Sequence, residues 1–175
     1  MSPRVLSPWE VVEAKRVLGD SIDWARVRVV EGARWPLGLA RLAARLQGHS
    51  PPAHNAVTLG HRIFFSRSLQ THLSEGSALR RGDFAWLVHE LVHVWQYERL
   101  GILALWRFAR LHLRRNVDPY EYGGADGLAK NATPRSLEDF TLEQQGEIAQ
   151  DYYARLDAGE DTRAWEPVIA QLRRV

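Results

Sequence analysis

The sequence predicts a mainly helical α+β domain with a small antiparallel sheet, and three observations lead to this prediction. Apolar residues recur at helical spacing in several long segments of the chain. Two short runs of β-branched and aromatic residues, 56–59 and 62–65, flank Gly60-His61 and indicate a β-hairpin with a two-residue turn. A chain of 175 residues with 45% hydrophobic content is the size of one globular unit, so we expect residues 1–175 to form a single domain.

The segments before the hairpin are expected to form two helices and a strand. Ser7 is a natural N-cap and Glu10 completes a capping box with it, so the first helix should cover about residues 8–18. Residues 26–30 alternate and are rich in β-branched side chains, which is typical of a strand. Residues 36–47 carry leucines and an alanine at helical spacing and indicate the second helix.

The segment 83–101 contains the pattern on which the functional prediction depends. Residues 89–93 read His-Glu-Leu-Val-His, an H-E-x-x-H motif. On a helix, His89 and His93 lie one turn apart on the same face, so both imidazoles can bind one zinc ion at roughly 2.0–2.1 Å. Glu90 then stands beside the metal as the general base.

The residues around the motif have the spacing of an amphipathic helix. Six apolar residues share one arc of this helix: Phe84, Leu87, Val88, Leu91, Val94 and Trp95. The motif residues share the opposite arc with Trp86, Gln96 and Tyr97. Asp83 is expected to be the N-cap and Gly101 to end the helix. We therefore expect one face in the core and the other at the functional site.

The C-terminal half should contain three more helices and one long loop. Residues 102–113 have helical apolar spacing, whereas residues 116–135 are rich in Gly and Pro and indicate an irregular loop. A loop of that length is either a lid over the site or a surface segment. Residues 141–153 begin a further helix, and residues 162–175 a short terminal one that must accommodate Pro167 near its start.

A catalytic zinc ion needs three protein ligands and one open position, so a third ligand is expected after His93. Glu143 and Glu147 lie one turn apart on the polar face of the same predicted helix. Either could bind the metal while the next acid along the helix orients a histidine, and spacing alone does not separate them. His112 is flanked by leucines and arginines, which favours a partly exposed helix face over a ligand role.

Composition narrows the classes of function. The chain has no cysteine, so any metal must be bound by histidines and carboxylates. The net charge is only +2 and the basic residues are scattered, so we expect no nucleic-acid partner. The N-terminal sequence lacks the apolar core of a secretory signal, and no run is long enough to span a membrane. We therefore expect a cytoplasmic protein, exported only by a route that needs no cleaved signal.

Residues 89–96, H-E-L-V-H-V-W-Q, resemble the H-E-L-x-H-V-x-Q signature of a bacterial zincin-like metallopeptidase family. Its members are often encoded with contractile injection or type VI secretion genes, some as Vgr-related proteins. Residues 143–148, E-Q-Q-G-E-I, are similar to that family's E-Q-Q-A-x-I stretch. In the wider gluzincin clan, a glutamate ligand on the following helix commonly has a small residue three positions later, and Glu143 and Gly146 match this pattern. The resemblance covers about residues 55–153 and implies a zincin-like fold of the gluzincin type.

The resemblance also implies an activity, that of a zinc metalloendopeptidase acting on a peptide or protein substrate. One Zn²⁺ held by His89, His93 and Glu143 would activate a water molecule for attack on the peptide bond. Glu90 would accept the proton of that water and pass it to the leaving amine. A component of a secretion apparatus is the expected partner.

The oxyanion formed during hydrolysis needs a hydrogen-bond donor besides the metal. We expect Tyr120 and Tyr122, at the start of the long loop, to be the best placed catalytic donors. Tyr152, Tyr153 and His112 are the other residues with a suitable group.

An alternative function is a zinc-binding accessory or adaptor protein of a secretion system, with weak or no catalysis. The presence of Glu90 argues against it, because a purely structural zinc site is closed and needs no base. A DNA-associated metalloprotease is disfavoured by the scattered charge.

Overall fold

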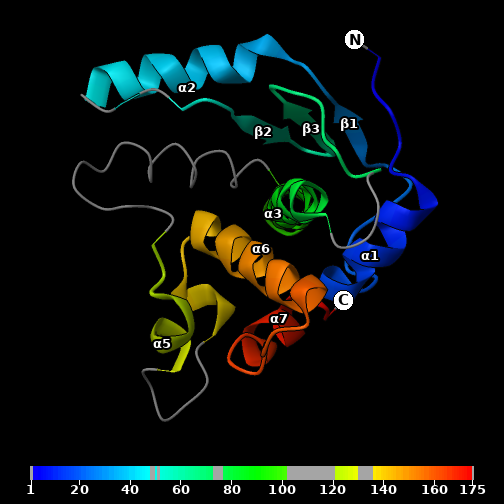
Figure 1. The fold of residues 1–175 in the computed structure, drawn as a ribbon, viewed down its shortest axis with the longest axis vertical. Coiled ribbons are helices and arrows are strands. Elements are labelled where there is room, and N and C mark those ends of the chain that lie inside the picture. Colours follow the sequence, from blue (N-terminus) through cyan, green and yellow to red (C-terminus); the bar gives the residue numbers. More distant parts are fainter. Residues whose placement is uncertain are drawn as a thin grey trace.

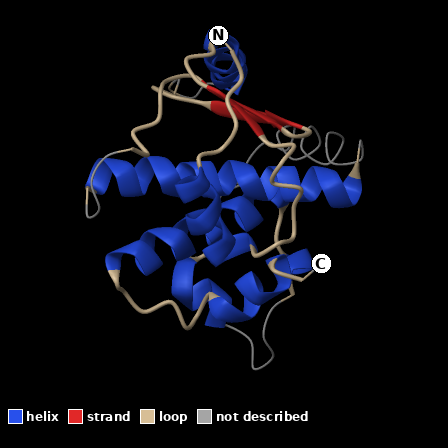
Figure 2. Cartoon of the chain, turned by 90° about the vertical axis from the view of Figure 1, so that its right-hand side faces the viewer, coloured by secondary structure: helices blue, strands red, loops and turns tan. Residues whose placement is uncertain are grey.

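The computed structural model of the protein describes residues 2–47, 50, 52–72, 77–101, 121–129 and 136–174, and the structural statements that follow concern these residues. One long helix, α3 (Ala78–Leu100), runs between a small sheet and the C-terminal helices (Figure 1). Figure 2, turned by 90°, shows α3 along its length, with the sheet on one side and most of the helices on the other. The predicted α+β class, mainly helical with a small sheet, is confirmed.

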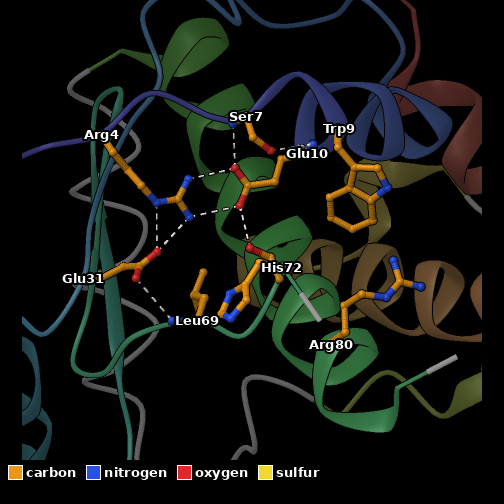
Figure 3. A pocket seen from close by; sticks show the side chains of 9 residues that line it. Arg4, Ser7, Trp9, Glu10, Glu31, Leu69, His72 and Arg80 are labelled. Carbon is orange, nitrogen blue, oxygen red and sulfur yellow. Dashed lines mark hydrogen bonds and ion pairs between the residues drawn. The ribbon is translucent and has the colours of Figure 1, made fainter. Parts of the chain in front are cut away.

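The first helix, α1 (Pro8–Leu18), begins with the predicted capping box. The backbone N–H of Glu10 donates to the Ser7 hydroxyl, and the Glu10 carboxylate accepts from the Ser7 N–H at 2.7 Å. Glu10 is nevertheless buried, and Arg4 binds its carboxylate through two guanidinium nitrogens at 2.8 and 3.0 Å (Figure 3). The Thr71 hydroxyl also donates to this carboxylate, at 2.9 Å. Burial favours the neutral acid, but these hydrogen bonds and the Arg4 charge hold the pKa of Glu10 below its usual value.

The sheet has three strands in the order β1-β3-β2. The hairpin of β2 (Ala56–Leu59) and β3 (Arg62–Phe65) is antiparallel and turns at Gly60, whose φ of 60° suits glycine, so the predicted hairpin is confirmed. The predicted strand 26–30 is shorter, β1 (Arg28–Val30), and it pairs with β3 in parallel. The sheet is therefore mixed rather than wholly antiparallel.

The parallel pairing follows from the connection after β1. Two parallel neighbouring strands need a connection that brings the chain back to the end of the sheet where the first strand began. The helix α2 (Arg34–Gln47) lies in the connection between β1 and β3. This helix begins two residues before the predicted residue 36. It lies on the side of the sheet away from α3 (Figure 1).

The N-terminus of α3 differs from the sequence prediction. The N-cap is Ser77, whose hydroxyl accepts from the Arg80 N–H, and Asp83 lies one and a half turns inside the helix. Asp83 is buried and forms an ion pair with Arg67, and it accepts the Gln70 N–H at 2.7 Å. The carboxylate therefore ties the helix to the preceding segment instead of capping it. The predicted end at Gly101 is confirmed, because its N–H donates to the Tyr97 carbonyl.

Most residues of both arcs of α3 are buried. All six residues of the predicted apolar arc are inside the core: Phe84, Leu87, Val88, Leu91, Val94 and Trp95. On the opposite arc His89, Glu90, His93 and Gln96 are also covered, since α6 (Leu142–Ala158) and β2 pack against that face. The face with the motif residues is thus internal, and these residues line a cleft.

The C-terminal part confirms two predicted helices and corrects the loop. α6 has Thr141 as N-cap, and α7 (Glu166–Leu172) has Pro167 in its first turn, later than the predicted start because residues 163–165 form a turn. Within the predicted loop 116–135, residues 124–129 form the short helix α5 (Gly124–Ala129), and a 3-10 turn, η1 (Leu137–Asp139), follows it. The predicted helix 102–113 and the remaining predicted-loop residues, apart from 121–123, lie outside the described residues. No described helix is long and apolar enough to cross a membrane.

Candidate metal centre

A cleft of about 290 Å³ lies between β2, α3 and α6. The motif residues His89, Glu90 and His93 line it from α3, and Glu143 and Glu147 line it from α6. The strand β2 forms the remaining wall, and the aromatic rings of Trp86 and Tyr97 lie further along α3. The cleft therefore contains all three sequence-predicted metal ligands and the predicted general base.

Three donor atoms converge at the floor of this cleft. The Nε2 atoms of His89 and His93 lie 3.4 and 3.6 Å from the same carboxylate oxygen of Glu143, Oε2. All three residues are buried, and one ligand atom from each lies within 4.8 Å of the others. His89, His93 and Glu143 thus form a group that could hold a metal ion.

Glu147, the alternative third ligand, occupies a different position. Its Oε1 lies 3.4 Å from Nδ1 of His89, on the far side of the ring from Glu143. Burial alone would lower the pKa of His89, but the neighbouring carboxylates of Glu143 and Glu147 raise it to about 10. Burial likewise opposes ionisation of Glu143, yet the charges and hydrogen bonds of His93 and His89 hold its pKa far below the usual value.

The orientation of His93 is fixed by a glutamine on the next turn of α3. Nδ1 of His93 lies 2.8 Å from Oε1 of Gln96, while Nε2 of Gln96 donates to the Leu142 carbonyl and to Oε1 of Gln145, both at 2.9 Å. Because the amide nitrogen of Gln96 faces two acceptors, its oxygen faces His93, and Nδ1 of His93 is the protonated nitrogen. Nε2 is then the ring nitrogen that is left to bind a metal.

Glu90 is held by a residue of the neighbouring strand. The hydroxyl of Thr58 donates to Oε2 of Glu90 at 2.6 Å, and both residues are buried. Sequence reasoning missed Thr58, because it lies 32 positions before Glu90 and no local pattern connects the two. It also missed the role of Gln145, whereas Gln96 belongs to the H-E-L-x-H-V-x-Q signature and had a visible signal.

The predicted oxyanion donors are not gathered in the cleft as far as the structure describes them. The Tyr122 hydroxyl donates to Asp151 and accepts from the indole N–H of Trp165 at 3.0 Å, and Tyr122 is not among the cleft-lining residues. Burial and the Asp151 carboxylate raise the pKa of Tyr122. Tyr120 lies outside the described residues, as does His112. The role of Tyr120 and Tyr122 as donors stays a prediction.

The other two tyrosines are engaged elsewhere. The hydroxyl of Tyr152 donates to Glu166 at 2.6 Å, and that of Tyr153 lies 3.4 Å from Glu13. Both interactions tie α6 to elements that do not line the cleft.

A larger cavity, about 520 Å³, lies beside Arg4 and Glu10 at the start of α1 (Figure 3). Its size alone would favour it as a ligand site. The Glu10 carboxylate, however, is already bound by Arg4, Ser7 and Thr71, so its charge is used within the fold. The cleft on α3, where donor groups converge on one point, is the stronger candidate.

Comparisons of sequence and of fold with known proteins both lead to VgrG2b, and no protein-family model matches the chain. Over 153 residues, or 86% of the chain, the sequence is 29% identical to the type VI secretion system spike protein VgrG2b of Pseudomonas aeruginosa, and it spans 13% of that protein's length. The fold resembles the effector domain of Pseudomonas aeruginosa VgrG2b with a TM-score of 0.55 and 25% identity, covering 94% of this chain and 80% of that domain. The chain is therefore similar in both sequence and fold to the VgrG2b effector domain, which links it to the Vgr-related proteins of type VI secretion systems.

Proposed function

We propose that the protein is a zinc-dependent metallopeptidase domain that acts as an effector of a type VI secretion system. The observation that carries the proposal is the convergence of His89, His93 and Glu143 on one point, with the Glu90 carboxylate in the same cleft. The link to secretion comes from the likeness to the VgrG2b effector domain. The enzymatic part rests on the site alone.

The donor set suits zinc. Two imidazoles and one carboxylate are a ligand set of catalytic zinc sites, which keep a fourth position open. Ligand atoms about 2.1 Å from a tetrahedral metal lie about 3.4 Å from one another. The distances of 3.4 and 3.6 Å from the two histidine nitrogens to Glu143 agree with this separation. The opening towards the cleft leaves a side from which water and substrate can approach.

The residues around the site have separate roles in the proposed peptide hydrolysis. Zinc, when bound, polarises the scissile carbonyl and makes a water molecule more acidic. Glu90 accepts the proton of that water and delivers it to the leaving amine. Gln96 fixes the nitrogen of His93 that faces the metal, and the Glu147 carboxylate lies 3.4 Å from the other ring nitrogen of His89, where it can support that ring in the same way.

The strand β2 offers a place for an extended peptide. It stands at the edge of the described sheet, and its residues line the cleft. The Asn55 carbonyl accepts from the Ser66 N–H at 2.9 Å, so Asn55 directs its main chain towards the β3 side. Because main-chain groups alternate along an antiparallel strand, those of Ala56 and Thr58 point to the open edge. A peptide added there as a further strand would pass alongside Glu90.

The test is a matched pair of substitutions on α3, assayed for cleavage of a peptide library and for metal content. Glu90→Gln should keep zinc and lower the rate of cleavage about 10²–10⁴-fold, because it removes the proton acceptor alone. Glu98→Gln is the control, since Glu98 lies on the same helix, pairs with His61 and does not line the cleft. Equal activity of Glu90→Gln and the parent protein would refute a hydrolytic role for this site.

A second function, a zinc-binding accessory or adaptor of the secretion apparatus, is favoured by the comparisons. The relative is named a spike protein, and neither name that the comparisons give states an enzymatic activity. In that case the parent protein would cleave peptides weakly or not at all, and Glu90→Gln would bind its secretion partner as the parent does. Zinc content alone does not separate the two functions, whereas zinc-dependent cleavage does.

A further inference from the structure

The contact between Thr58 and Glu90 has the geometry of a strong hydrogen bond. The distance of 2.6 Å from the threonine hydroxyl to Oε2 of Glu90 lies in the range of hydroxyl donors to ionised carboxylates. The Glu90 carbonyl oxygen is also near, at 3.4 Å, but a hydroxyl has one proton and the carboxylate is the closer and stronger acceptor. Thr58 is 7% exposed and Glu90 5%, so water does not compete freely for this bond.

This bond determines which carboxylate oxygen remains for chemistry. Within the described residues, Thr58 is the only side chain that donates a hydrogen bond to the Glu90 carboxylate. Oε2 is occupied by the threonine proton, which leaves Oε1 to accept a proton from water. A neutral donor fixes the carboxylate without adding the positive charge that would weaken it as a base.

The main chain of Thr58 faces a different direction from its hydroxyl. As derived from the Asn55–Ser66 pairing, the N–H and carbonyl of Thr58 point to the open edge of β2. One residue thus presents its main chain to the extended peptide and its side chain to the general base. A substitution of the side chain can separate the two roles, because the main chain stays in place.

We propose that Thr58 is the positioning residue of the general base Glu90, holding its carboxylate while the edge strand holds the peptide. This inference rests on the proposed peptidase function. According to this inference, the hydroxyl of residue 58 contributes to turnover and is dispensable for peptide binding and for metal binding.

The experiment compares Thr58→Val, which keeps the shape and removes the hydroxyl, with Thr58→Ser, which keeps the hydroxyl. Thr58→Val should lower kcat about 10–100-fold, the usual effect of losing an orienting partner. Its KM and zinc content should equal those of the parent protein. Thr58→Ser should restore most of kcat. In crystal structures of the metal-free variants, the serine should keep the bond to Glu90 and the valine should let the carboxylate turn.

Thr71→Val is the matched control, because Thr71 is also a buried hydroxyl that donates to a buried carboxylate, that of Glu10. It lies away from the cleft and should leave kcat unchanged.

Unchanged kcat in Thr58→Val, equal losses in the valine and serine variants, or loss of zinc in the valine variant would each overturn the inference. An active parent protein with an inactive Glu90→Gln and a fully active Thr58→Val would refute the role of Thr58 alone. An inactive parent protein would refute the proposed function and this inference with it.

Discussion

Gly146 sets how closely α6 approaches the ring of His89. A Cβ atom at this position would lie 2.7–2.9 Å from three atoms of the His89 imidazole, closer than side chains pack. Gly146 lies inside α6, where glycine is less favourable than alanine by about 1 kcal/mol. The close packing of His89 against α6, which brings Glu143 within 3.4 Å of its Nε2, accounts for a glycine at this unfavourable place.

Gly146→Ala should therefore weaken the metal centre although it improves the helix. The added methyl group forces the His89 ring or α6 to move, and we expect zinc affinity to fall about 10–100-fold, as when a ligand loses its orientation. Competition with a zinc-binding dye measures this directly.

Gly82→Ala is the control for that substitution. Gly82 lies inside α3, and a Cβ there would meet nothing within 4 Å. Gly82→Ala should raise the free energy of unfolding by about 0.5–1 kcal/mol and leave zinc affinity unchanged. If Gly146→Ala also leaves zinc affinity unchanged, the position of the His89 ring does not depend on the absence of a side chain at residue 146.

The candidate site was predictable from the sequence where the spacing of nearby residues determines their relative positions. The i, i+4 spacing of His89 and His93 fixes their common face in any helix, and the resemblance singled out Glu143 over Glu147. Thr58 was not predictable, because its pairing with Glu90 depends on how a strand packs across a helix. A sequence carries no periodic signal for such a contact.

At the scale of elements, the α3–α6 pair holds the two halves of the metal centre together. Gln96 is fully buried between them and connects His93 to the Leu142 carbonyl and to Gln145. Gln145 in turn donates to the Leu137 carbonyl at 3.0 Å. The first turn of α6, which carries Glu143, is thereby attached to His93, the histidine with which Glu143 could hold a metal ion.

Gln96→Leu should loosen this attachment and the orientation of His93 together. Unpaired buried groups cost about 1–3 kcal/mol, so thermal unfolding should occur at a lower temperature. Zinc affinity should also fall about 10–100-fold, because Nδ1 of His93 loses its acceptor. Calorimetry and zinc titration measure the two effects.

Comparing Gln96→Glu with Gln96→Leu separates the effect of Gln96 on the orientation of His93 from its effect on the stability of the fold. Gln96→Glu keeps an acceptor for His93 but places a second acceptor against the Leu142 carbonyl and Gln145, so it should lose stability and retain more zinc affinity than Gln96→Leu. Equal zinc affinities in the two variants would show that the bond to His93 does not orient the ligand.

Elements were predictable from the sequence where their own residues determine them. The capping box of α1 and the hairpin around Gly60 are local, and both were placed correctly. The N-cap of α3 was predicted wrongly as Asp83, because the carboxylate of Asp83 pairs with Arg67, a residue outside the helix, instead of capping α3. The parallel pairing of β1 with β3 likewise depends on a connection of many residues. Six residues of a glycine-rich segment form α5, where composition alone indicated a loop.

At the scale of the whole molecule, α3 contributes apolar side chains to the core and its motif side chains to the floor of the cleft. The sheet covers one side of it and α6 the other (Figures 1 and 2), so the motif residues are buried yet reach a cleft. The similarity to the VgrG2b effector domain extends over 94% of this chain, and it therefore includes the layers that build the cleft. The fold therefore supports the link to a secretion effector, whereas the proposed hydrolysis rests on the group of His89, His93 and Glu143 with Glu90 beside it.

The most direct test of this account is anomalous X-ray scattering at the zinc edge, recorded from crystals of protein purified without chelator. We predict one zinc peak bound by Nε2 of His89, Nε2 of His93 and the Glu143 carboxylate, with Glu147 at the other ring nitrogen of His89. No zinc at this position, or a zinc bound by Glu147 in place of Glu143, would contradict the account.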